Sequence, residues 1–142
     1  MTLSEIRDYL AAEFPQVFES NDITVDAAAG GVATMRLLPA EKHLRPGGII
    51  SGPTLMMLAD AAAYAALLSL SDGAKMAVTT NLNISFLRAA PPGAPIRQSA
   101  TVVKAGRRLA VVVAEAFDPA EALLAHTTMT YAMPGSDARV VS

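Results

Sequence analysis

Residues 53–70 read PTLMMLADAAAYAALLSL, an almost uninterrupted apolar run rich in alanine and leucine. A run of this length makes an α-helix of about five turns, and Pro53 suits its first turn, where no backbone N–H is needed. A helix that is apolar nearly all round has to be covered on most of its sides. A strongly curved β-sheet wrapped around the helix would provide that cover.

Asp60 interrupts this run and is the only charged residue between Arg45 and Asp72. An ionised carboxylate that is buried without a partner costs several kcal/mol, and no basic side chain lies within helical reach of Asp60. This placement makes Asp60 the first candidate for a catalytic acid or base. The structural alternatives are an acid that caps a segment, pairs with a distant arginine, or faces solvent at an interface between subunits.

The remainder of the chain is typical of β-strands. Residues 23–28 and 32–38 flank Gly30 and Gly31 as a hairpin, and later strands are expected at 76–87, 96–105, 108–117 and 123–131. The short links between them predict strands that pair antiparallel with their neighbours in the chain. The predicted fold class is α+β, with a five- or six-stranded antiparallel sheet wrapped around one long central helix.

The two ends of the chain differ from this pattern. The segment 1–20 is predicted to be helical, with an amphipathic helix over Glu5–Phe14 that is capped by Ser4 and stopped by Pro15. Residues 135–142 are expected to form a flexible tail. The whole chain, 1–142, is expected to be a single domain.

Composition narrows the possible partners and cofactors. The chain is 52% apolar and only 17% charged, so surplus apolar surface points to a homodimer or homotetramer. Its net charge of −2 argues against nucleic acid as a partner. There is no cysteine, and His43 and His126 are far apart in the sequence, so no metal and no cofactor is expected. The N-terminal residues are polar and charged where a signal peptide would need an apolar stretch, and Asp60 argues against a membrane span, so a cytoplasmic protein is expected.

A glycine-rich segment, Gly47 to Pro53, leads into the predicted helix. Glycine allows a close approach of the backbone to a ligand, and helix N-termini favour anions. Because Pro53 has no N–H, the donor best placed to hold a developing oxyanion is the amide of Gly52. The alternative interpretation is that this segment is an ordinary loop that leads into a helix.

The segment HLRPGGIISGP at 43–53, followed by Leu58, Ala59 and Asp60, resembles the signature of hotdog-fold acyl-CoA thioesterases of the phenylacetate-pathway type. Six positions separate Arg45 from Ser51 and nine separate Ser51 from Asp60, which is the spacing of the family's asparagine, histidine and acid. The strand patterns at 79–88 and 104–109 match the family as well. The resemblance extends over residues 20–134.

The resemblance implies roles for particular residues. Asp60 would be the general base or nucleophile that attacks the thioester, Gly52 would give the oxyanion N–H, and Thr79 would position the water. Active sites of this family lie across a dimer interface, and the substrate is an acyl-CoA. The chain departs from the family at Arg45, Ser51 and Pro53, where the family has asparagine, histidine and a second glycine. Arg45 would pair with Asp60 or meet the phosphates of the ligand.

Other candidates rest on position and chemistry. Asn81 alternates with apolar neighbours on a strand, and Tyr64 lies one turn beyond Asp60, so both are candidates to contact the substrate together with Arg45 and Ser51. Basic residues near strand ends are candidates to hold coenzyme A phosphates, although such clusters are often solvated surface. These residues are Arg88, Lys104, Arg107 and Arg108.

Three other functions compete with hydrolysis of an acyl-CoA. A non-catalytic acyl-CoA binding or sensing module on the same fold would explain the departures at Arg45 and Ser51. A hotdog dehydratase would need a histidine beside the acid, and His43 and His126 are poorly placed for that role. A serine hydrolase built on Ser51 lacks the G-x-S-x-G spacing.

Overall fold

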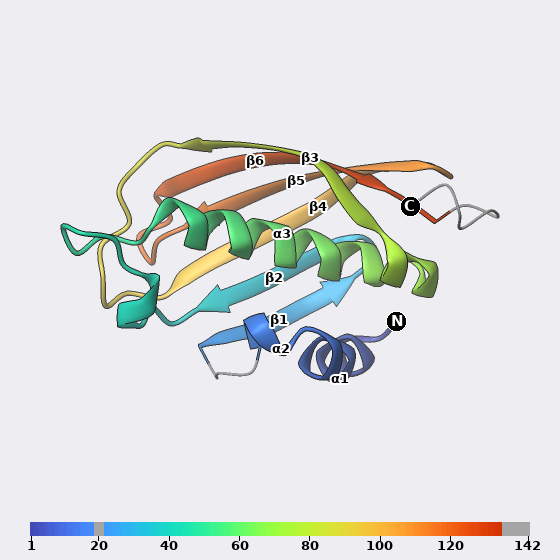
Figure 1. Ribbon diagram of the computed structural model, residues 1–142, viewed down its shortest axis with the longest axis horizontal. Coiled ribbons are helices and arrows are strands. Elements are labelled where there is room, and N and C mark those ends of the chain that lie inside the picture. The colour runs from blue at the N-terminus through green and yellow to red at the C-terminus, as the bar shows by residue number, and fades with distance from the viewer. Residues whose placement is uncertain (19–21, 135–142) are drawn as a thin grey trace.

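The computed structural model describes residues 1–18 and 22–134. The chain forms one six-stranded antiparallel sheet with the long helix α3 lying across its concave face (Figure 1). This is the predicted fold class, now with six strands. The helices are α1 (Leu3–Glu13), α2 (Pro15–Phe18) and α3 (Gly52–Leu68), and the strands are β1 (Ile23–Ala29), β2 (Val32–Leu37), β3 (Val78–Phe86), β4 (Ile96–Ala105), β5 (Leu109–Phe117) and β6 (Leu123–Ala132).

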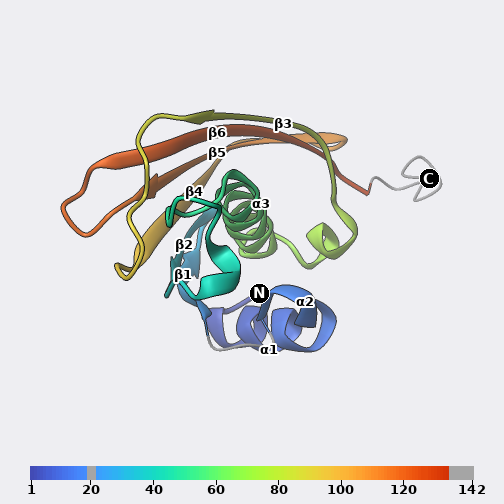
Figure 2. The same cartoon turned by 60° about the vertical axis from the view of Figure 1, so that its left-hand side comes forward.

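Helix α3 occupies the predicted apolar run with small shifts at both ends. It begins at Gly52, because the Ser51 side chain accepts from the backbone N–H of Thr54 and caps the helix. It ends at Leu68, where the Ser69 hydroxyl donates to the carbonyl of Ala66. The sheet curves around α3, as Figure 2 shows in a view along the helix. Most α3 side chains are buried against it, which explains why the run is apolar on nearly every side.

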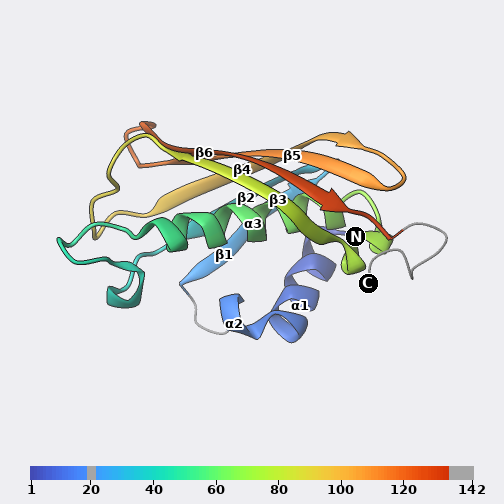
Figure 3. The same ribbon diagram turned by 45° about the horizontal axis from the view of Figure 1, so that its top comes forward.

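The N-terminal helix differs from the prediction in its cap. Helix α1 starts at Leu3, and Thr2 is its N-cap in place of Ser4. The Thr2 hydroxyl accepts from Glu5 N at 3.2 Å, and the Glu5 carboxylate accepts from Thr2 N at 3.0 Å, which is a capping box. Helices α1 and α2 contact β1, which forms the sheet edge opposite to β3 (Figure 3). The end of the predicted N-terminal segment at 19–20 and the predicted tail at 135–142 lie outside the described residues.

Strand pairing corrects the prediction that neighbours in the chain pair throughout. The order in the sheet is β1-β2-β4-β5-β6-β3, so β3 pairs with β6 and β2 pairs with β4. The link between β3 and β4 contains Pro91 and Pro92, which cannot donate backbone hydrogen bonds, and it does not form a hairpin. Strand β3 therefore forms an edge of the sheet with one side unpaired.

A β-bulge in β3 sets the direction of the side chains that follow α3. The pairing of β3 with β6 shifts between Thr79 and Asn81, so Thr79 lies opposite Tyr131 while Asn81 lies opposite Thr130. The extra residue reverses the alternation. Thr79 thus shares the inward face with Leu82, whereas the Asn81 side chain is exposed. Residues 79 and 81 would share one face of a regular strand, and the bulge separates them.

Candidate active site

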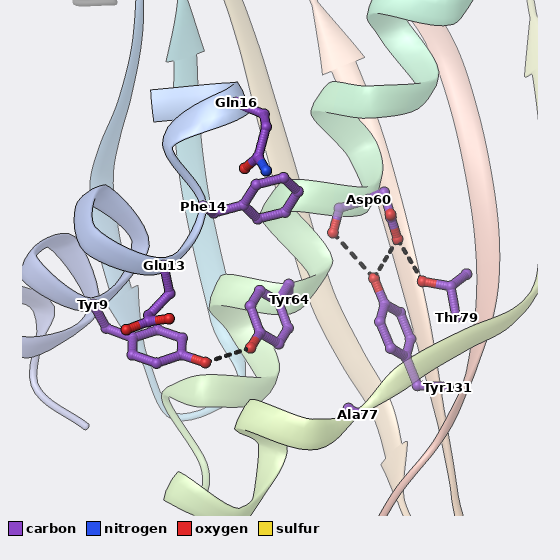
Figure 4. Close-up of a pocket in the computed structure, with 9 residues that line it drawn as sticks. All are labelled: Tyr9, Glu13, Phe14, Gln16, Asp60, Tyr64, Ala77, Thr79 and Tyr131. Carbon is purple, nitrogen blue, oxygen red and sulfur yellow. Dashed lines mark hydrogen bonds between the residues drawn. The ribbon is translucent and has the colours of Figure 1, made fainter. Parts of the chain in front are cut away.

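Asp60 lies at one wall of a pocket of about 340 Å³ between α3, the N-terminal helices, β3 and β6 (Figure 4). The carboxylate is partly buried, and no ion pair joins it to an arginine within the described part of the chain. The acid is therefore neither exposed to bulk solvent nor locked against a guanidinium. The pocket is lined by Tyr9, Glu13, Phe14, Gln16, Asp60, Tyr64, Ala77, Thr79 and Tyr131.

Two hydroxyl groups converge on one oxygen of this carboxylate. Thr79 Oγ1 donates to Asp60 Oδ1 at 2.7 Å, and the Tyr131 hydroxyl donates to the same Oδ1 at 2.6 Å. The Tyr131 hydroxyl also lies 3.0 Å from the backbone carbonyl oxygen of Asp60. The other carboxylate oxygen, Oδ2, accepts no hydrogen bond from the described residues. One oxygen is thus held in place while the second remains available to a ligand in the pocket.

Tyr131 reaches this position from the last strand, β6. Its side chain is among the largest that are fully buried in the chain. Burial, reinforced by the negative charge of Asp60, raises the pKa of Tyr131 far above its usual range. The phenol therefore stays protonated and acts only as a donor toward the carboxylate at neutral pH.

The N-terminal helices supply the opposite wall of the pocket. Tyr9 of α1 and Tyr64 of α3 place their hydroxyl groups 3.1 Å apart, and the Tyr64 hydroxyl donates to the carbonyl of Lys75 at 2.7 Å. Burial also raises the pKa of Tyr64. Lys75 Nζ lies 4.9 Å from the centre of the Tyr9 ring, a cation–π contact. The structure therefore brings the predicted Tyr64 into the Asp60 pocket, although its hydroxyl is already engaged.

Gly52 lies in a different hollow, at the N-terminus of α3. A Cβ added at Gly52 would lie 3.2 Å from Cζ of Phe86, so the aromatic ring packs directly against this backbone. The Gly52 N–H donates to no described residue, as expected for the first turn of a helix. Arg45 and Arg88 line the same hollow, whose volume is about 370 Å³. The predicted oxyanion donor and two predicted basic residues therefore lie together.

The hollow at Gly52 and the Asp60 pocket do not merge within one chain. Eight positions separate Gly52 from Asp60 on α3, which corresponds to about 12 Å along the helix axis. A thioester carbonyl is far shorter than this distance. Arg45 lines the same hollow as Gly52. Within residues 1–18 and 22–134, no ion pair joins Arg45 to Asp60, so the predicted pairing of these two residues is not formed.

The other predicted basic residues lie at the opposite end of the fold. The backbone N–H of Val102 in β4 donates to the carbonyl of Gly31, and Gly31 packs against the Leu70 side chain beyond the C-terminus of α3. Helix α3 is about 25 Å long. The β4–β5 turn and the end of β4 are thus remote from Gly52 in the same chain. They carry Lys104, Arg107 and Arg108.

Two further predicted residues have other surroundings. Ser51 caps α3 and lines a third hollow beside His43, Thr54 and Met57. The backbone N–H of Ala40 donates to His43 Nδ1 at 2.8 Å, and burial lowers the pKa of His43, so this imidazole is neutral at pH 7. Asn81 is exposed and is not among the residues that line the Asp60 pocket.

Tyr131 is the principal residue that the sequence analysis missed. It lies on the buried phase of β6 with Thr127 and Met129, and a buried tyrosine normally needs a hydrogen-bond partner for its hydroxyl. That requirement is the one signal the sequence offered.

Among the described residues, no cluster of three or more His, Asp and Glu side chains is arranged to hold a metal ion. None of the described helices has the length and hydropathy needed to span a bilayer.

The fold is shared with solved thioesterase structures. A putative thioesterase from Silicibacter sp. is 38% identical, with a TM-score of 0.82 over 94% of this chain and 92% of that chain. Zebrafish thioesterase superfamily member 2 is 25% identical, with a TM-score of 0.84 over 95% and 99% of the two chains. A hypothetical thioesterase from Streptococcus pneumoniae, solved with coenzyme A, is 18% identical, with a TM-score of 0.78 over 92% and 97%.

Comparison at the level of sequence families agrees with the structures. A search of curated protein sequences gives no significant match. The family model described as the thioesterase superfamily matches residues 47–125, more than half of the chain, and includes both α3 and β3. The protein therefore belongs to the thioesterase superfamily and is a thioester hydrolase.

Proposed function

We propose that this protein hydrolyses acyl-CoA thioesters, with Asp60 as the general base or nucleophile and the Gly52 amide as the oxyanion donor. The observation that carries the proposal is the Asp60 carboxylate in its pocket. Its Oδ1 is held by two hydroxyl groups while Oδ2 accepts no hydrogen bond from the described residues. A carboxylate oriented in this way is suited to take a proton from water or to attack a carbonyl carbon.

Asp60 could bring about hydrolysis of the thioester by either of two routes. In the first, Asp60 Oδ2 removes a proton from a water molecule whose oxygen bonds to the thioester carbon, the C–S bond breaks, and the proton is passed on to the leaving sulfur. In the second, Oδ2 bonds to that carbon and expels the thiolate, and water then hydrolyses the mixed anhydride. Both routes place negative charge on the carbonyl oxygen, which a backbone N–H would stabilise.

A second copy of the chain would complete this site. Asp60 and Gly52 are about 12 Å apart along α3, so one carbonyl cannot contact both within a single chain. Strand β3 is an edge strand with one side unpaired, and Val78 and Phe86 on it are exposed. Pairing of two β3 edges about a two-fold axis reverses the direction of the second α3 and would bring its Gly52 toward the first Asp60.

The same arrangement would gather the basic residues. Reversal of the second copy carries its α3 N-terminus, with Arg45 and Arg88, toward the end of the first copy where the β4–β5 turn lies. Arginines from both copies would then flank the entrance, where they suit the phosphates of coenzyme A. The coenzyme A in the S. pneumoniae protein of the same fold supports this choice of ligand.

Substitution of Asp60→Asn tests the proposal. The asparagine oxygen still accepts from Thr79 and Tyr131, so the fold should be retained, but the residue can neither take a proton nor attack. We expect the wild type to release free thiol from a panel of short, medium and aromatic acyl-CoA esters, and the variant to lose at least about 1,000-fold in kcat. Full activity in the variant, or no turnover of any ester by the wild type, would refute the proposal.

A binding or sensing module is the second candidate. The observation that favours it is the Ser51 hydroxyl, which is used to cap α3, at a position where the resembled family has a histidine. In this case, coenzyme A esters would raise the melting temperature of both the wild type and Asp60→Asn without any thiol release. Turnover by the wild type alone separates the two functions.

A further inference from the structure

Tyr131 is unusual among the residues around Asp60 because it is buried, protonated and aimed at the carboxylate from the strand beyond β3. Its hydroxyl lies 2.6 Å from Asp60 Oδ1 and 3.0 Å from the Asp60 carbonyl oxygen, 71 positions away in the chain. Figure 4 shows the phenol between these two acceptors, with Thr79 on the other side of Oδ1. A donor that bridges the backbone and the side chain of one residue fixes the rotation of that side chain.

We infer that Tyr131 is a positioning residue, which holds Asp60 Oδ1 so that Oδ2 is the oxygen presented to the thioester. This inference rests on the proposed function of Asp60. Without Tyr131, only the Thr79 hydroxyl would hold Oδ1, and the carboxylate would be free to turn about its Cβ–Cγ bond. Hydrogen bonds between a neutral donor and an ionised acceptor are short and strong, which the 2.6 Å distance reflects.

The inference requires that Tyr131 act through Asp60 and through no other group in the pocket. Tyr64 directs its hydroxyl to the Lys75 carbonyl and to Tyr9. Glu13, Tyr9 and Tyr64 are the other titratable groups that line the pocket, and within the described part of the chain no hydrogen bond joins any of them to Asp60 or Tyr131. The effect of removing the Tyr131 hydroxyl is therefore expected at Asp60.

Tyr131→Phe is the test, because it removes a single oxygen and keeps the buried ring. Loss of a donor disfavours the ionised carboxylate. We expect kcat to fall about 10- to 100-fold with KM within about twofold, the scale of one hydrogen bond to a charged group. We also expect the acidic limb of the pH–rate profile to move to higher pH.

Thr127→Val is the matched control. Thr127 lies four positions before Tyr131 on the buried face of β6, and its hydroxyl is buried without a hydrogen-bond partner in the described residues. Removal of this hydroxyl should leave kcat and the pH–rate profile unchanged. If Thr127→Val lowers kcat as much as Tyr131→Phe, or if Tyr131→Phe behaves as the wild type, the inference is overturned.

A second measurement does not depend on activity. In protein labelled with ¹³C at aspartate carboxyl carbons, the carboxyl resonance of Asp60 at pH 7 should change position in Tyr131→Phe, which loses a donor to Oδ1, and stay in place in Thr127→Val. An unmoved resonance in Tyr131→Phe contradicts the inference even where no ester is hydrolysed. In the wild type, the Tyr131 hydroxyl proton should exchange slowly enough to be seen by NMR. Asp60→Ala should shift that signal upfield, because only the backbone carbonyl at 3.0 Å remains as an acceptor. A signal at an unchanged position in Asp60→Ala would equally overturn the inference.

Discussion

Thr79 donates from β3 to Asp60 of α3 across 2.7 Å, although the regular alternation of β3 would turn Thr79 away from the helix. The bulge between Thr79 and Asn81 makes this contact possible. Helix α3 and strand β3, which are joined by the nine-residue connection 69–77, thus meet at one carboxylate oxygen. The function proposed for Asp60 depends on that local irregularity.

Thr79→Val should lower kcat about 10-fold, because valine keeps the shape of threonine and removes one of the two donors to Asp60 Oδ1. Thr79→Ser keeps the hydroxyl and should retain most of the activity. Steady-state kinetics with a single acyl-CoA ester distinguishes the two variants. A valine variant as active as the wild type would show that the Thr79 hydroxyl does not support Asp60.

Gly52→Pro should lower kcat about 100- to 1,000-fold, because it removes the N–H proposed to stabilise the oxyanion. Proline is compatible with the first position of a helix, and Ser51, with φ −73° and ψ 151°, already has the conformation preferred before proline. Gly52→Ala is the control. It introduces the same Cβ against Phe86 but keeps the N–H, so it should lose only a few-fold. A proline variant as active as the alanine variant would exclude this amide from the mechanism.

Mixed dimers should report whether one site uses two chains. Co-expression of Asp60→Asn with Gly52→Pro in equal amounts should give about a quarter of wild-type activity, because half of the dimers are mixed and each mixed dimer keeps one intact site of two. Either variant alone should be inactive. Mixed dimers purified through two different affinity tags should reach about half of the wild-type activity per dimer, which is the measurement. Inactive mixed dimers would place both groups in the same chain.

Glu13→Gln should change the choice of acyl group, because the Glu13 carboxylate lines the pocket beside Asp60. Repulsion should disfavour acyl chains that end in a carboxylate. The ratio of kcat/KM for glutaryl-CoA over butyryl-CoA is therefore expected to rise about threefold at low salt, and less in 0.5 M salt. Asp8→Asn, an exposed acid of α1 outside the pocket, should leave this ratio unchanged.

The free energy of unfolding should fall as the pH drops below about 6.5, partly because of His43. Burial lowers the pKa of His43 in the folded chain, so the unfolded chain binds more protons in the window between the folded and unfolded values. The contribution of His43 to stability is thus fully present above the pKa of His43 in the unfolded chain, and it is lost as the pH falls below that pKa. Urea unfolding at pH 5.5 and 7.5 should show a smaller difference for His43→Asn, whose side-chain oxygen can accept from Ala40 N. An unchanged difference would assign the acid sensitivity to other groups.

The central helix, a sheet of five or six strands with approximate bounds, and the isolation of Asp60 could all be predicted from the sequence. These features follow from local periodicity, because a helix that is apolar on nearly every side and strands of alternating polarity each leave their own pattern over a few residues. The spacing of Arg45, Ser51 and Asp60 indicated the family for the same reason, since all three lie within one loop and one helix.

The surroundings of Asp60 depend on contacts between residues that are far apart in the chain. Tyr131 reaches Asp60 because β3 pairs with β6, and Thr79 reaches it because of a bulge in that pairing. The N-terminal helix supplies Tyr9 and Glu13 to the same pocket. Strand order, register and bulges are set by the packing of residues that are far apart in the chain, so no local pattern of the sequence encodes them.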